Sequence, residues 1–147
     1  MSKVRKPLWR CPKCGHRFVA RNLSHSCGRH RLGDHFRGRD PELRALFRSL
    51  VALARRHGPV TVYAQKTRIV MMVRVRFAGA VVRSSYLVVG LWLKRRVEHP
   101  RLRRVEFIPP GEFVHYFRLA DRAELDEAFG ALVREAYAIG RQEQRRG

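Results

Sequence analysis

The sequence predicts an α+β fold, in which a helix, an antiparallel sheet of four to five strands and a C-terminal helix packed on the sheet follow an N-terminal metal-binding segment. Two stretches with helical periodicity flank a middle region of β-prone segments separated by short turn signals. Consecutive strands joined by short turns favour antiparallel pairing, with the helices on one face of the sheet. We expect a zinc knuckle over residues 1–36 and an α+β domain over residues 37–147.

The first helix is predicted to begin after residue 40. Asp40 provides an N-cap, Pro41 suits the first helical position and Glu42 complements the helix dipole. Gly58 and Pro59 end the pattern. The apolar stripe expected to face the core consists of Leu43, Leu46, Phe47, Leu50 and Leu53.

The middle of the chain carries the strand signals. An alternating run from Ile69 to Phe77 predicts one strand, and Ala78 with Gly79 predicts the turn after it. The other predicted strands are Val60 to Tyr63, Val81 to Leu93, Val105 to Ile108 and Phe113 to Leu119. The second of these is either continuous or bent near Ser84 and Ser85 or near Gly90. Asp121 and Glu124 have capping-box spacing and are expected to open a final helix that carries Leu125, Phe129, Leu132 and Ile139.

Charge is the strongest compositional signal. The chain has 32 basic and 12 acidic residues, a formal net charge of +20. Such a surface attracts polyanions, so nucleic acid is the expected partner class. Only five of the basic residues are lysine, and this preference for arginine can follow from genome composition. Genome composition does not explain why acidic residues are so few.

No apolar run is long enough to predict a transmembrane helix, and the basic N-terminus is followed by no apolar stretch typical of a secretory signal. An odd number of cysteines with one close pair also suits a reducing compartment. We therefore expect a cytoplasmic protein that does not bind membranes.

A cluster of cysteine and histidine residues between Cys11 and His30 predicts a metal-binding site. Cys11 and Cys14 are separated by two residues, and Cys27 follows with a histidine on either side, His25 and His30. This ligand set and spacing predict a tetrahedral Zn²⁺ site. The fourth ligand is His25 or His30, and spacing leaves both open. Four protein ligands leave no open position, so we expect a structural rather than a catalytic metal.

The runs CPKCGHRF, SHSCG, PELRALF, GPVTVYAQKTRI and LDEAFGALVREAYAIG together resemble an uncharacterised bacterial family, a domain of unknown function preceded by such a knuckle. The resemblance covers nearly the whole chain. It implies a small α+β fold and zinc, and it favours His25 over His30 as the fourth ligand. It implies no particular activity.

Basic residues form three candidate nucleic-acid-binding groups. Four surround the predicted knuckle, a second set alternates along the predicted strands with Tyr86 or Trp92 nearby, and a third follows the strand that ends at Leu93. An ordinary solvated sheet face explains the second set equally well. The candidates are Arg17, Arg21, Arg29 and Arg31, then Lys66, Arg68, Arg74, Arg76 and Arg83, then Lys94, Arg95 and Arg96 with Arg101, Arg103 and Arg104.

Catalytic motifs are missing from the sequence. His35, His57, His99 and His115 are scattered, and there is no HExxH, nucleophile elbow, P-loop or GxGxxG. We expect a zinc-binding accessory protein that binds nucleic acid through basic surfaces, with no catalysis. The alternative is a protein-interaction or small-ligand-binding module whose positive charge is incidental.

Overall fold

The structure is a computed structural model that describes residues 31–142 and two short strands nearer the N-terminus. These strands, β1 (Trp9–Arg10) and β2 (Arg17–Phe18), pair antiparallel. The five predicted zinc ligands, Arg21 and Arg29 lie outside the described residues, and only the backbone of Arg17 is described.

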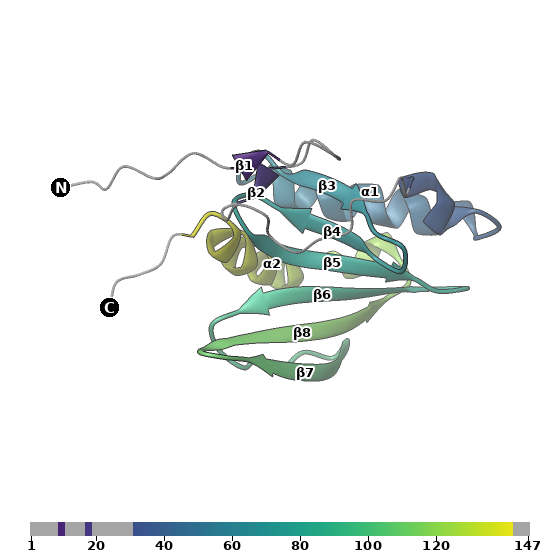
Figure 1. The fold of residues 1–147 in the computed structure, drawn as a ribbon. Coiled ribbons are helices and arrows are strands. Elements are labelled where there is room, and N and C mark those ends of the chain that lie inside the picture. The colour runs from purple at the N-terminus through teal and green to yellow at the C-terminus, as the bar shows by residue number, and fades with distance from the viewer. Residues whose placement is uncertain (1–8, 11–16, 19–30, 143–147) are drawn as a thin grey trace.

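The α+β class predicted from the sequence is confirmed. Six antiparallel strands form one sheet in the order β3-β4-β5-β6-β8-β7 (Figure 1). The elements in chain order are η1 (Leu32–Phe36), α1 (Pro41–Arg55), β3 (Thr61–Ala64), β4 (Ile69–Met72), β5 (Arg76–Val82), β6 (Leu87–Leu93), β7 (Leu102–Ile108), β8 (Glu112–Leu119), η2 (Arg122–Glu124) and α2 (Glu127–Gly140).

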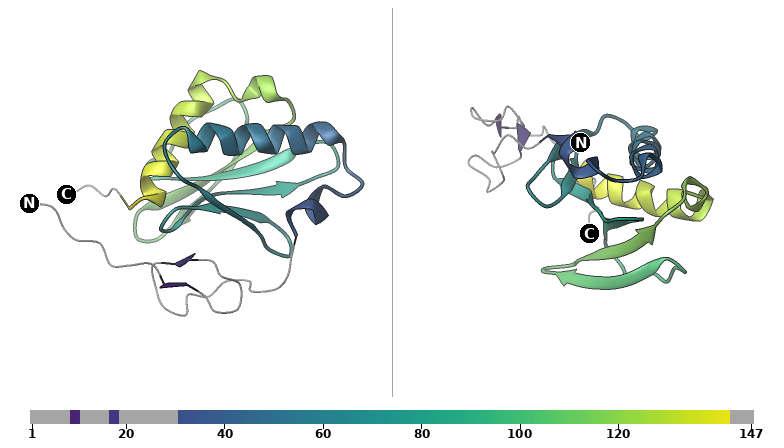
Figure 2. Two further views of the ribbon diagram at one scale, coloured as in Figure 1. Left: turned by 90° about the horizontal axis from the view of Figure 1, so that it is seen from above. Right: turned by 90° about the vertical axis from the view of Figure 1, so that its right-hand side faces the viewer.

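Both α-helices cover the same face of the sheet, as expected (Figures 1 and 2). Helix α2 packs on β5 and β6, and α1 packs on α2. The Asp40 carboxylate caps α1 by accepting the Glu42 N–H at 3.0 Å, as the sequence predicted. The stripe of α1 is buried at Leu43, Leu46, Phe47 and Leu50, and these side chains share one core with the inward side chains of the sheet.

The predicted strand count was too low, because two turns were misplaced. The run from Ile69 to Phe77 is two strands, since the chain bends at residues 73–75, and the predicted turn at Ala78 and Gly79 lies inside β5. The backbone N–H groups of Arg74 and Val75 both donate to the carbonyl oxygen of Gly140, at 2.9 and 3.1 Å. This acceptor comes from the far end of the chain, so local alternation could not reveal the bend.

The predicted strand from Val81 to Leu93 is likewise two strands. β5 ends at Val82, and β6 begins at Leu87 after a turn in which the Arg83 N–H donates to the Tyr86 carbonyl at 2.9 Å. Arg83, Ser84 and Ser85 are exposed in this turn, between the buried Val82 and Leu87, so the bend considered near Ser84 and Ser85 is a complete turn between two strands.

The capping box is present but opens a different element. Asp121 and Glu124 cap the short helix η2, whereas α2 begins after Asp126, whose carboxylate accepts the Phe129 N–H at 2.9 Å. The final helix therefore starts later than the sequence predicted. Its apolar residues pack on the sheet, with the Phe129 ring edge-on to Phe117 of β8 at 5.2 Å between centroids.

Candidate nucleic-acid interface

The face of the sheet opposite the helices carries a shallow hollow, which we call the open-face hollow. Its centre is formed by Gly79 of β5 and Gly90 of β6, which are direct partners across the two strands. The volume of the hollow is about 240 Å³. This is less than the roughly 300 Å³ at which ordinary small-molecule sites begin, so the hollow suits one ring of a larger ligand.

Four arginines line this hollow, two from strands and two from turns of the sheet, and none of the described residues that line it is acidic. Arg68 precedes β4 and Arg83 follows β5; neither side chain forms an ion pair or hydrogen bond with a residue that the structure describes. Arg76 Nε donates to the Tyr63 hydroxyl at 3.2 Å. The fourth arginine, Arg104, lies on β7.

Aromatic rings are interleaved with these cations. Trp92 and Tyr116 line the hollow, and the Arg104 guanidinium stacks over the Tyr116 ring at 4.2 Å. The Tyr116 hydroxyl donates to Glu106 at 2.9 Å. Burial raises the pKa of Tyr116, and the hydrogen bond to Glu106 raises it further, so this phenol stays neutral at physiological pH. The hydrogen bond to Glu106 and the stacked Arg104 guanidinium therefore hold the Tyr116 ring in one position beside the hollow.

A second stacked pair lies on the same face. The guanidinium of Arg118, on β8, lies 4.0 Å from the centre of the Tyr86 ring. Arg118 pairs across the sheet with Val88, which lines the hollow. The open face thus presents two arginine–aromatic stacks, and each of them includes a residue of β8.

The remaining basic residues predicted to contact nucleic acid are placed elsewhere. Lys66 is exposed in the turn between β3 and β4, Arg31 is exposed before η1, and Arg74 donates to the Gln142 side chain at 2.9 Å. The cluster after β6 is largely engaged: Lys94 pairs with Glu112 at 3.1 Å, Arg95 pairs with Glu135 at 2.7 Å, and Arg96 lies over the Phe113 ring at 5.1 Å.

The structure therefore joins Arg68, Arg76 and Arg83 with Trp92, as the alternating pattern suggested, and separates them from Lys94, Arg95 and Arg96. Sequence reasoning missed Tyr116, because the order of β6, β8 and β7 in the sheet brings it to the hollow. The two glycines were the available signal, since a glycine inside a strand often marks a close approach.

Within residues 31–142, no group of three or more metal-ligating side chains could hold a metal ion. Over the same part of the chain, neither helix has the length and apolar character that crossing a membrane requires.

A family model described as a domain of unknown function, DUF5655, matches residues 32–140. The match spans η1 to the end of α2 and so includes every strand that forms the hollow. No curated protein and no solved structure matches the chain.

Proposed function

Since this chain belongs to the DUF5655 family, whose function is unknown, we propose from its geometry that it binds single-stranded nucleic acid on the open face of its sheet. The observation that carries the proposal is the convergence of four arginines and two aromatic rings around the Gly79–Gly90 pair. A basic groove with exposed rings is the usual platform for single strands, because phosphates meet the cations while bases stack on the rings.

Two of the arginines support phosphate contact most directly. The side chains of Arg68 and Arg83 are exposed and have no carboxylate partner among the described residues. Guanidinium groups bind phosphate oxygens through paired N–H donors, which gives affinity without reading sequence. We infer weak sequence selectivity and strong dependence on salt.

The rings support base contact. Trp92 is partly exposed beside the hollow, and a hollow of about 240 Å³ over two glycines leaves room for one base. The strand would pass from the Arg68 side to the Arg104 side of the sheet. The bases of a duplex are stacked inside the helix and cannot reach the aromatic rings of the open-face hollow. Single strands should therefore bind more tightly than a duplex.

The test is fluorescence anisotropy with labelled 20-nucleotide single strands of DNA and RNA and a 20-base-pair duplex, titrated with the full chain at low salt. We expect both single strands to bind more tightly than the duplex. Trp92→Ala should weaken single-strand binding about fivefold or more, because one base–aromatic stack is worth roughly 1–3 kcal/mol.

A double variant isolates the electrostatic part. Arg68→Gln/Arg83→Gln removes two charges from the open face, and Arg48→Gln/Arg134→Gln removes two from the helices on the other face. Only the first should weaken binding strongly. Equal losses in the two variants would mean that net charge rather than this surface binds the strand, and the proposal would be wrong.

We also propose that Cys11, Cys14 and Cys27 bind a structural Zn²⁺ together with His25, or alternatively His30. The support is the ligand set and its spacing. Three thiolates require reducing conditions, which fits a cytoplasmic location. The metal would brace the most basic quarter of the chain, where Arg17, Arg21 and Arg29 would add phosphate contacts.

A further inference from the structure

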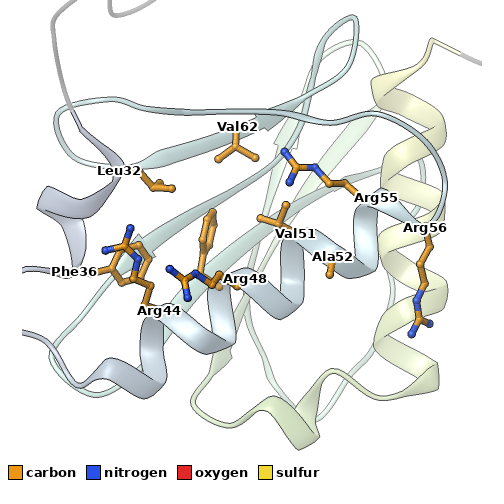
Figure 3. A pocket seen from close by; sticks show the side chains of 10 residues that line it. Leu32, Phe36, Arg44, Arg48, Val51, Ala52, Arg55, Arg56 and Val62 are labelled. Carbon is orange, nitrogen blue, oxygen red and sulfur yellow. The ribbon is translucent and has the colours of Figure 1, made fainter.

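A second hollow lies on the helix-covered side of the molecule, between α1, η1 and β3 (Figure 3). We call it the α1 groove. Its volume is about 540 Å³, within the range of roughly 300–1,000 Å³ typical of small-molecule sites. Its apolar lining is Leu32, Phe36, Phe47, Val51 and Val62.

The rim of the groove is positively charged. Arg44, Arg48, Arg55 and Arg56 line it, and no described lining residue is acidic. The Arg44 guanidinium lies 5.7 Å from the centre of the Phe36 ring, and Arg55 donates to the Val60 carbonyl at 3.1 Å. The Arg48 side chain forms no hydrogen bond or ion pair with the residues that the structure describes.

This charge is not compensated within the helix. The only acid of α1 is Glu42, which pairs with Arg122 of η2 at 3.6 Å rather than with a rim arginine. Arg44 and Arg48 are four residues apart, so they are neighbours on the helix surface. Like charges at this spacing destabilise a helix. The arrangement is therefore unfavourable for α1 alone, and an anion between the two guanidinium groups would relieve the repulsion.

We propose that the α1 groove binds a small carboxylate with an apolar body. The carboxylate lies between Arg44 and Arg48, because the fork of a guanidinium matches the two oxygens of a carboxylate. The apolar body lies on Leu32 and Val62, the partly exposed side chains of the lining, above the buried Phe47 and Val51, and removes their exposed apolar surface from water.

The composition of the groove separates it from the proposed nucleic-acid surface. The α1 groove has an aliphatic floor and charge along one rim, whereas the open-face hollow has cations among partly exposed rings. A sugar–phosphate chain carries a charge at every nucleotide and would make no apolar contact with the aliphatic floor of the α1 groove. The two proposals are therefore independent.

The experiment is calorimetric titration of the full chain with decanoate, kept below its micellar concentration, and with decan-1-ol as the uncharged analogue. We expect saturable binding of decanoate and at least tenfold weaker binding of decan-1-ol. Arg44→Gln/Arg48→Gln should weaken decanoate binding at least tenfold without lowering the melting temperature, because it removes like-charge repulsion.

A steric variant tests the location. Ala52 lies on the exposed side of α1 and lines the groove, so Ala52→Trp should fill it and weaken decanoate binding at least tenfold. Ala131→Trp makes the same change at an exposed position of α2 outside the groove and should leave binding unchanged.

Absence of saturable decanoate binding would overturn the proposal, as would equal affinities of the wild-type and Ala52→Trp proteins. An acidic amphipathic peptide provides a further arm. If that peptide binds in a manner sensitive to Ala52→Trp while decanoate does not bind, the groove is a peptide-docking surface and the carboxylate proposal is wrong. None of these outcomes bears on oligonucleotide binding at the open face.

Discussion

The backbone N–H of Val97 donates a hydrogen bond of 3.0 Å to Nε2 of the His115 side chain, which is fully buried in β8. Nδ1 of the same ring lies 3.2 Å from the Phe113 carbonyl oxygen. Because Nε2 accepts, Nδ1 must carry the proton, and the imidazole is neutral. His115 therefore fixes the chain that leaves β6 against β8, and it has no position from which to act on a substrate.

Acid should weaken the fold through this residue. Burial is the largest effect on the pKa of His115 and lowers it, and the positive charges of Arg96 and Arg95 lower it further. The Phe113 carbonyl and Glu135 raise the pKa, but the net shift is downward. The unfolded chain takes up a proton near pH 6.5, whereas the folded chain does so only at lower pH. The stability contributed by the neutral ring is thus fully present above pH 6.5 and is lost as pH falls toward the folded-state pKa.

Urea unfolding between pH 7.5 and 5 measures this effect. His115→Gln should be less stable than the wild type at pH 7.5, by about 1–3 kcal/mol if the Val97 N–H loses its acceptor. The free energy of unfolding of the variant should also depend less on pH. Parallel pH profiles for the two proteins would contradict the role assigned to His115.

Two glycines of α2 should respond in opposite directions to the same substitution. A Cβ at Gly140 would lie 2.6 Å from Cδ1 of Phe77, whereas a Cβ at Gly130 would lie 3.6 Å from Cδ1 of Leu53. Gly140→Ala should destabilise the protein by about 1–3 kcal/mol through overpacking. Gly130→Ala should stabilise it by roughly 0.5–1 kcal/mol, because alanine favours the helix. Thermal melts compare the pair, and a similar shift for both would show that the Phe77 contact is unimportant.

Salt provides a quantitative check on single-strand binding. With four arginines on phosphates, the logarithm of the association constant should fall against the logarithm of salt concentration with a slope of about −3, or roughly 50-fold between 50 and 200 mM. Arg68→Gln/Arg83→Gln should reduce the magnitude of that slope by about 1.4. An unchanged slope in this variant would place the phosphate contacts elsewhere on the chain.

Zinc content should report the predicted ligands. Protein purified without chelator is expected to contain about one zinc per chain by elemental analysis, because four ligands of this kind form one closed site. Cys11→Ser/Cys14→Ser should reduce this to near zero. Of His25→Ala and His30→Ala, we expect the first to lose the metal and the second to retain it. Zinc-free wild-type protein would refute the site.

Several elements could be predicted because their signals are local. The cap at Asp40, the buried stripe of α1 and the strand from Phe113 to Leu119 follow from side-chain types at adjacent positions. The bend at residues 73–75 could not be predicted, because its backbone donors are satisfied by Gly140 at the end of α2. Two predicted strands therefore became three, and the sheet has six strands rather than four or five.

The candidate nucleic-acid interface also has features that the sequence predicts and features that only the tertiary structure reveals. The sequence by itself determined the α+β class, the excess of positive charge and the set of potential zinc ligands, since each is a property of residue type and spacing. The tertiary structure decided which cations lie together: Arg68, Arg83 and Arg104 line one hollow around Gly79 and Gly90. Arg68 and Arg83 have no acidic partner among the described residues, whereas Arg104 lies 4.0 Å from Glu106, and Lys94 and Arg95 are paired with acids away from the hollow. The physical reason is that strand order and cross-strand register bring distant residues onto one face, and spacing along the chain does not encode that order.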